Sequence, residues 1–301
     1  MPESAGATLG SIIAVALQNY QAALSGYARA NLQAASNHRI NTPGDNPSGM
    51  FTVDSLQTHM DALNTAIGNA TEAGSLVSTA LTAVGNMKNT LESMRSIAQE
   101  ATGSLTADER AAHQAEIDDG ISSLDDIVST TKYKDTKLLD GSYTNKTIQI
   151  GADAGDTTAL SITDLRTGYL GTGASPGGLA DIDLSTPGSA ATAVDIIDNA
   201  LSAVRLEYGK LTGEKSFVID AQVNSLTDGR NALQSSYDSI QNISDVEAAA
   251  NLLAQEIRMN TAASMVAQAG SIQGNVVSLL MGGLAGSQMS SAASYMTARW
   301  G

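Results

Sequence analysis

Three histidines are the side chains of this sequence best suited to acid–base or metal chemistry. His38, His59 and His113 lie far apart in the sequence, and none stands in an HExxH pattern or beside a candidate nucleophile. The chain has no cysteine, which excludes disulfides and cysteine metal sites. It also has neither of the common glycine-rich phosphate loops. We therefore expect no enzymatic activity and no cofactor.

Two acidic stretches contain the residue types of a divalent-cation site. One is the sequence GADAGD at 151–156, which has part of the pattern of a calcium loop. The other is a set of carboxylates that a helix starting after Thr106 would carry on one side: Glu116, Asp118, Asp119, Asp125 and Asp126. A simple turn and a solvated helix face explain these stretches more economically. We expect no metal at either.

Charged side chains avoid both ends of the chain. Residues 1–60 hold 5 of them and the last 60 residues hold 5, although the whole sequence has 16 basic and 31 acidic residues. The ends are therefore suited to lose contact with bulk water, and the middle to keep it. The net charge of −15 argues against nucleic acid and anionic membranes as partners. We find no pattern of a cleaved signal peptide or a membrane span.

The histidines and acidic residues described above must be positioned by long helices. In residues 51–101 apolar side chains recur in gaps of three and four, which predicts a helix of about 50 residues, roughly 75 Å long at about 1.5 Å per residue. The stripe comprises Val53, Leu56, Met60, Leu63, Ile67, Ala70, Gly74, Val77, Leu81 and Val84 and, after a slip of three residues, Met87, Leu91, Met94 and Ala98. Such a helix cannot bury its stripe alone, so other helices must cover it.

Each end of the chain carries a similar seam with almost no charge. The N-terminal seam, on a helix from about 8 to 35, is Leu9, Ile13, Ala16, Tyr20, Ala23, Tyr27 and Ala30, with Ile12, Leu17 and Leu24 beside it. The C-terminal seam is Ala262, Met265, Ala269, Ile272, Val276 and Leu279, followed by Leu280. Because the two ends match in length, period and lack of charge, we expect them to pair.

The segments between these helices follow from local signals. Residues 39–49 read RINTPGDNPSG, whose prolines and glycines exclude a regular helix. Thr106 and Glu109 form a capping box for a helix ending near Thr131. Three short strands are predicted at 137–139, 147–150 and 159–162, with a turn at 140–141. A third heptad runs from Val194 through Leu201, Val204, Tyr208, Leu211, Lys215 and Val218, and after a phase shift it continues from Leu226 to Ile240.

These elements predict a mainly α fold, an elongated antiparallel helical hairpin or coiled-coil bundle with a small β-hairpin region and paired terminal helices. We expect an inner domain of residues 1–35 and 248–301, joined by connectors at 36–50 and 241–247. A rod-like helical domain would comprise residues 51–167 and 189–240, with its β unit at 133–162. Residues 168–188, rich in glycine and proline, would form an exposed loop.

With these residues assembled, the chain resembles bacterial flagellin. The connector resembles the family's RINSAKDDAAG, with matches at Arg39, Ile40, Asn41, Asp45 and Gly49. Residues 71–101 are similar to the family's long helix, and the stretches QAEI, TKYKDTKLLDG and IQIGADAGDT are similar to its second helix and hairpin. SMVAQAGSIQGNVVSLL at 264–280 is similar to its closing segment.

The resemblance implies a structural subunit that polymerises into the hollow flagellar filament and transmits motor torque. It implies export through a type III apparatus to the cell exterior and contacts with further copies, an export chaperone, and the cap and hook-filament junction proteins. The inner-core assembly residues would be Leu9, Ile13, Leu17, Tyr20, Leu24, Tyr27, Met265, Ile272, Val276, Leu279 and Leu280. The alternatives are the junction protein itself, or a secreted adhesin or effector on the same scaffold.

Two departures from the family lead to further expectations. The family's innate-immune receptor site corresponds to Leu91, Arg95, Ile97 and Glu116, but Ser93 stands in place of an arginine, so we expect weak recognition. Residues 281–301 extend past the segment where family members stop. Gly282, Gly283 and Gly286 argue against extending the last helix there, so we expect this tail to fold back along the inner core.

Overall fold

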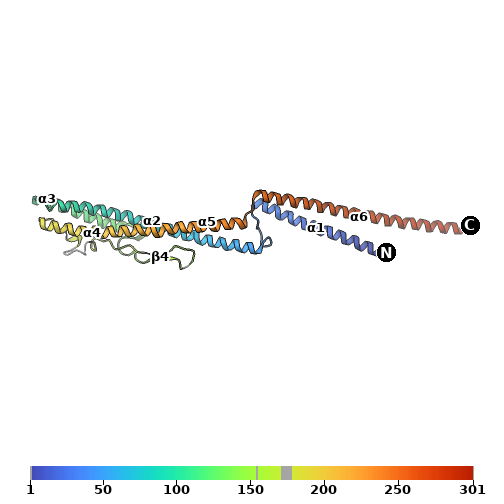
Figure 1. Cartoon of the computed structure of the whole chain (residues 1–301), viewed down its shortest axis with the longest axis horizontal. Helices are drawn as coiled ribbons and strands as arrows, with labels where there is room; N and C mark the ends of the chain where they lie inside the picture. Colours follow the sequence, from blue (N-terminus) through green and yellow to red (C-terminus); the bar gives the residue numbers. More distant parts are fainter. Residues whose placement is uncertain (1, 154, 171–177, 301) are drawn as a thin grey trace. The chain divides into compact units, whose positions relative to one another are not determined.

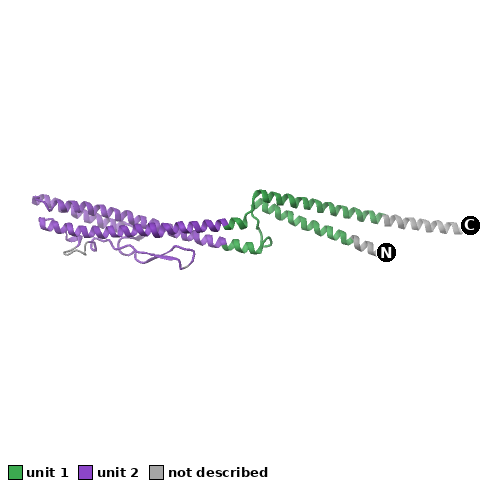
Figure 2. Ribbon diagram, viewed as in Figure 1, with its two compact units in different colours: residues 1–55, 236–301 green, residues 56–235 purple. Residues whose placement is uncertain are grey.

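The computed structural model describes the backbone of residues 2–153, 155–170 and 178–300, and side chains from Gly10 to Ser278 within those ranges. The chain divides into two compact units, one of Met1–Ser55 with Ser236–Gly301 and one of Leu56–Ser235 (Figure 2). Helices α2 (Pro47–Glu100) and α5 (Ala221–Gln241) contribute residues to both units. The mainly α fold with small antiparallel strand pairs is confirmed.

The terminal unit is built on two paired helices, α1 (Pro2–Ser36) and α6 (Asp245–Trp300) (Figure 1). Their most buried side chains are alanines: Ala16, Ala30, Ala262 and Ala269, each 8% exposed or less. Small side chains let the two backbones approach closely. At Gly26 an added Cβ would lie 2.7 Å from Gln255 Oε1. The expected pairing of the two ends is thus confirmed.

The second unit has one continuous core between α2, α3 (Ala107–Thr130) and α4 (Pro187–Gly213), which lie side by side in Figure 1. The α2 stripe stays buried after its slip of three residues. The residues that follow the slip are all 1% exposed or less: Met87, Leu91, Met94 and Ala98. The capping box at Thr106 is formed as predicted, and it begins α3. From α3, Ile117, Leu124 and Val128 join this core.

A π-helical segment, η2 (Glu214–Asp220), links α4 to α5 and corrects the predicted third heptad. A π-turn accommodates an extra residue, so the buried face shifts by one position. Ile219 is 2% exposed, whereas Val218, the residue we expected in the seam, is 38% exposed. Separately, Glu207 is buried where Tyr208 was expected, but this residue precedes the π-segment, and Leu211 after it is buried as predicted. The predicted phase shift is real, and the π-segment is its structural cause.

The β region consists of two separate antiparallel pairs. β1 (Lys132–Tyr133) pairs with β2 (Thr136–Lys137), and β3 (Lys146–Gln149) pairs with β4 (Thr157–Leu160). The predicted strand residues Leu138, Leu139 and Ile162 lie outside these ladders because they turn into the core, where each is fully buried. The predicted turn is confirmed by Gly141, whose φ is +78°. A side chain there would be strained and would meet Asp164.

Two further expectations need correction. Residues 178–184 are not an exposed loop. Leu179 and Leu184 are fully buried, because Gln114 on α3 donates to the carbonyl of Ile182 and accepts from the backbone N–H of Leu184. The connector is also shorter than expected, since α2 begins at Pro47, a position where the missing N–H costs nothing.

The three glycines of the tail do not end the last helix. Helix α6 continues through them to Trp300, so the expected chain reversal at this point is wrong. Each glycine costs only about 1 kcal/mol relative to alanine, and a nucleated helix gains one hydrogen bond for each added residue. The tail side chains lie outside the described residues, so the expected packing of Leu284, Tyr295 and Trp300 stays a prediction.

Candidate interaction surface of the terminal helices

Helices α1 and α6 leave much of their apolar surface uncovered. Five of the predicted assembly residues or their neighbours are about half exposed: Ile12 (55%), Leu17 (47%), Leu24 (46%), Met265 (44%) and Ile272 (45%). Ile13, Tyr20, Tyr27 and Val276 are half-buried. Leu9, Leu279 and Leu280 lie outside the described side chains. In a single copy of this unit, the hydrophobic seam is therefore only partly buried.

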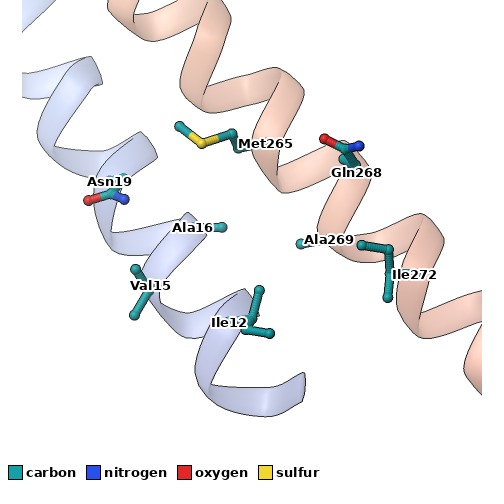
Figure 3. A pocket seen from close by; sticks show the side chains of 8 residues that line it. All are labelled: Ile12, Val15, Ala16, Asn19, Met265, Gln268, Ala269 and Ile272. Carbon is teal, nitrogen blue, oxygen red and sulfur yellow. The ribbon is translucent and has the colours of Figure 1, made fainter. Parts of the chain in front are cut away.

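A groove of about 270 Å³ lies between the two helices. Figure 3 shows Ala16 and Ala269 at its narrow part, with Ile12 and Ile272 flanking it. Val15, Asn19, Met265 and Gln268 complete a lining without a charged group. An apolar cavity of roughly 150 Å³ already holds a benzene-sized group, so a large apolar side chain would fit here.

The connector residues converge on Asp45. Its Oδ2 accepts hydrogen bonds from the backbone N–H of Asn41 (3.1 Å) and of Thr42 (2.9 Å) and from the Thr42 hydroxyl (3.0 Å). Its Oδ1 lies 2.9 Å from Arg29 Nε on α1. Burial acts to raise the pKa of Asp45, but these hydrogen bonds and the charge of Arg29 together hold that pKa below its usual value. Asp45 is therefore a carboxylate that fixes the turn.

The outgoing and returning connectors are hydrogen-bonded to each other. The backbone N–H of Arg39 donates to the carbonyl of Gln241 (2.6 Å), and Gln241 Nε2 donates to the carbonyl of Ile40 (2.8 Å). Ile40 is 2% exposed, and Gly49 packs so closely that an added Cβ would lie 2.6 Å from Ile40 Cδ1. The five connector residues matched in the sequence thus form one structured junction.

The four residues corresponding to an immune-receptor site are not equally available. Leu91 is fully buried in the core and Ile97 is half-buried, so Leu91 cannot be a surface contact as expected. Arg95 is paired with Asp198 of α4, with 2.5 Å between Nε and Oδ1. Glu116 is exposed and lies 3.3 Å from His113 Nδ1. Of the four, Glu116 is exposed, and Arg95 and Ile97 are partly exposed.

Sequence reasoning missed a buried arginine. Arg110 is 7% exposed and donates to the carbonyls of Ala101 (2.5 Å), Gly103 (2.6 Å) and Leu184 (3.3 Å). It closes the C-terminal end of α2 and holds the segment that leads into α4. No local signal separates this residue from a solvated arginine in the first turn of a helix.

The described residues contain no group of three or more histidine, aspartate or glutamate side chains arranged to hold a metal ion. The acidic set of α3 faces solvent. Among the described helices, none has a stretch of the length and hydropathy that crossing a membrane requires. Exposed large apolar side chains recur along both α1 and α6.

Comparison with known proteins finds similarity to one family. Residues 11–144 match the family model for the bacterial flagellin N-terminal helical region. The chain is thus similar to bacterial flagellins. Flagellin B of Vibrio anguillarum is 34% identical over 158 residues, which cover 52% of this chain and 42% of that protein. A flagellin of Listeria innocua serovar 6a is 26% identical over 255 residues, 81% of this chain and 88% of its own length.

The chain spans less than half the length of the Vibrio flagellin that it matches. Among solved structures, a putative flagellar hook-associated protein from Vibrio parahaemolyticus shares the fold. It has a TM-score of 0.56 and 15% identity, and the match covers 66% of this chain and all of that protein.

Proposed function

We propose that this chain is a structural subunit of the bacterial flagellar filament, outside the cell, that polymerises with many copies of itself into a hollow helical tube. The observation that carries the proposal is the row of half-exposed apolar residues along α1 and α6, at the ends of the chain where charge is scarce. A soluble monomer rarely leaves so much continuous apolar surface open unless a partner covers it.

The same surface explains how assembly would couple to folding. Two helices that meet along a seam of alanines bury little apolar area, so their pairing alone is weakly stabilised. Neighbouring copies would insert side chains such as Leu17 or Ile272 into grooves like the one in Figure 3. Burial would then stabilise each copy only within the polymer.

Further partners follow from the proposed role. Export would require a chaperone that covers the apolar termini, and the two ends of the filament would contact cap and hook-filament junction proteins. Arg95, tied to Asp198, and Ser93, in place of an arginine, support weak recognition by the animal receptor for flagellin. Reporter cells that respond as strongly to this protein as to an enteric flagellin would contradict that expectation.

The direct test is polymerisation of the purified chain, followed by electron microscopy and sedimentation. We expect tubes from the wild type and none from Leu17→Asp or Ile272→Asp, because each places a charge in the apolar surface. Gln18→Asp, an exposed polar position on the same helix, is the matched control and should polymerise. A strain lacking this chain that still builds normal filaments would refute the proposal, and it would favour an adhesin or effector role.

A further inference from the structure

The small hairpin β1–β2 places two lysines directly opposite each other. Lys132 and Lys137 are register partners in the antiparallel pair, and both are exposed. Directly opposite residues on such a pair have Cβ atoms about 4.5–5.5 Å apart, and like charges at these positions are destabilising. Two ammonium groups are thus held on one face of a ribbon in a chain whose net charge is −15.

Within the described part of the chain, neither Lys132 nor Lys137 forms an ion pair, and the one carboxylate that senses either of them is Asp140, whose pKa the charge of Lys137 helps to lower. The neighbouring Lys134 is committed elsewhere, since it forms an ion pair with Glu72 of α2 and lies 5.7 Å from the Tyr133 ring centroid. Asp135, in the turn of the hairpin, makes no ion pair with Lys132 or Lys137. The pair is therefore an exposed site that a carboxylate from another molecule would stabilise.

The complementary surface lies on α3. At about 100° per residue, Asp108, Asp119 and Asp126 fall within about 20° of one line along the helix, opposite the buried Ile117 and Leu124. All three are exposed, and none forms an ion pair in the described residues. The positions between them on this line are the small residues Ala112, Ala115 and Ser122. A partner surface can therefore approach this acidic line closely.

We propose that the Lys132–Lys137 ribbon of one copy docks on the Asp108–Asp119–Asp126 line of a second copy. The inference rests on the proposed function and names one of its contacts. Helix α3 leads directly into β1, so the acidic line and the basic ribbon follow each other along one direction of the chain. A copy displaced along that direction brings opposite charges together. Such a contact joins two different surfaces, and it can therefore repeat from copy to copy into a filament.

A second copy fits this ribbon better than a polyanion does. The two unpaired sets have opposite charge and lie on the same chain, so each copy supplies the complement of its neighbour. Two lysines on a short ribbon are also too few for a nucleic-acid surface, which neutralises several phosphates at once.

Zero-length cross-linking tests the contact in the unmodified protein. Light and isotopically heavy copies are mixed under polymerising conditions and treated with a carbodiimide, which condenses a lysine amine with a carboxylate to an amide with net loss of water. We expect mass spectrometry to find light–heavy peptides that join Lys132 or Lys137 to Asp119 or Asp126. Filaments that form without these cross-links would overturn the inference and leave the filament role intact. Absence of filaments would instead refute the proposed function as well.

Charge-reversal variants provide a second test of the proposed contact. Lys132→Glu/Lys137→Glu and Asp119→Lys/Asp126→Lys should each raise the critical concentration by about tenfold, since attraction becomes repulsion at two positions. The four changes combined should restore polymerisation. Lys146→Glu removes an exposed lysine of β3 and is the control for charge alone. If the combined variant polymerises no better than the two double variants, the inference is wrong. So would lysine variants that polymerise normally but lose retention on immobilised heparin, because a polyanion would then be the partner.

Discussion

Asp45 in the connector holds Arg29 of α1 at 2.9 Å between Oδ1 and Nε, while its other oxygen accepts three hydrogen bonds from Asn41 and Thr42. One carboxylate thus joins a helix to the turn that follows it. Because its side chain is only 7% exposed, water cannot replace these bonds without opening the turn.

Asp45→Asn should loosen this turn, and its effect should depend on pH. The folded pKa of Asp45 is lower than the unfolded value of about 3.9, so its stabilisation is complete above that value and is lost as pH falls through the folded pKa. Amide exchange at Asn41 and Thr42 should therefore be faster in the variant at pH 6, and the difference should shrink below about pH 4. Asp228→Asn removes an exposed carboxylate on α5 as the control. An equal difference at every pH would contradict this role of the charge.

Replacing Arg110 should destabilise the second unit strongly. Arg110→Met leaves three backbone carbonyls without their donor, which we expect to lower the free energy of unfolding by about 2–4 kcal/mol. Arg205→Met, which removes an exposed arginine paired with Glu92, should cost at most about 1 kcal/mol. Urea unfolding of the two variants measures the contrast. Equal losses of unfolding free energy in the two variants would show that Arg110 does not stabilise the C-terminal end of α2.

Two adjacent residues test the register of the π-segment. Ile219→Ala should cost about 2–4 kcal/mol because that side chain is 2% exposed. Val218→Ala, beside it at 38% exposure, should cost less than about 1 kcal/mol. The ranking reverses if α4 and α5 form one regular α-helix with Val218 in the seam. Thermal unfolding of both variants therefore decides between the two registers.

Replacing two helical glycines by alanine should change the stability of the protein in opposite directions. At Gly120 an added Cβ would lie 2.7 Å from Met94 Cγ, so Gly120→Ala should cost about 1–3 kcal/mol through overpacking. Gly229 of α5 faces open space, and Gly229→Ala should stabilise by up to about 1 kcal/mol. Melting temperatures that rise for both variants would show that α3 does not pack on Met94 as described.

The helices were predictable because their apolar residues recur over many turns. The stripe from Val53 to Ala98 and the capping box at Thr106 needed no tertiary information. The π-segment was visible only as a phase shift, because sequence cannot say which turn widens. Burial of Leu179 and Leu184 could not be foreseen, because it depends on Gln114 and Arg110, distant residues whose types suggest solvent exposure.

The candidate surface was only partly predictable for a similar reason. Heptad positions identified the seam of α1 and α6, yet its innermost contacts proved to be alanines, with larger side chains left at the margins. The matched connector residues converge on Asp45 through backbone geometry that residue types alone do not specify. Leu91 shows the reverse error, because a position matched to a receptor contact lies inside the core.

The π-segment between α4 and α5 also has a mechanical consequence. Under a bending or twisting load, a regular helix distributes strain evenly over its turns. A turn with a different hydrogen-bond spacing interrupts that regularity, and such places are where helices kink. Residues Glu214–Asp220 therefore form a compliant point between α4 and α5, and elastic deformation of these two helices should concentrate there.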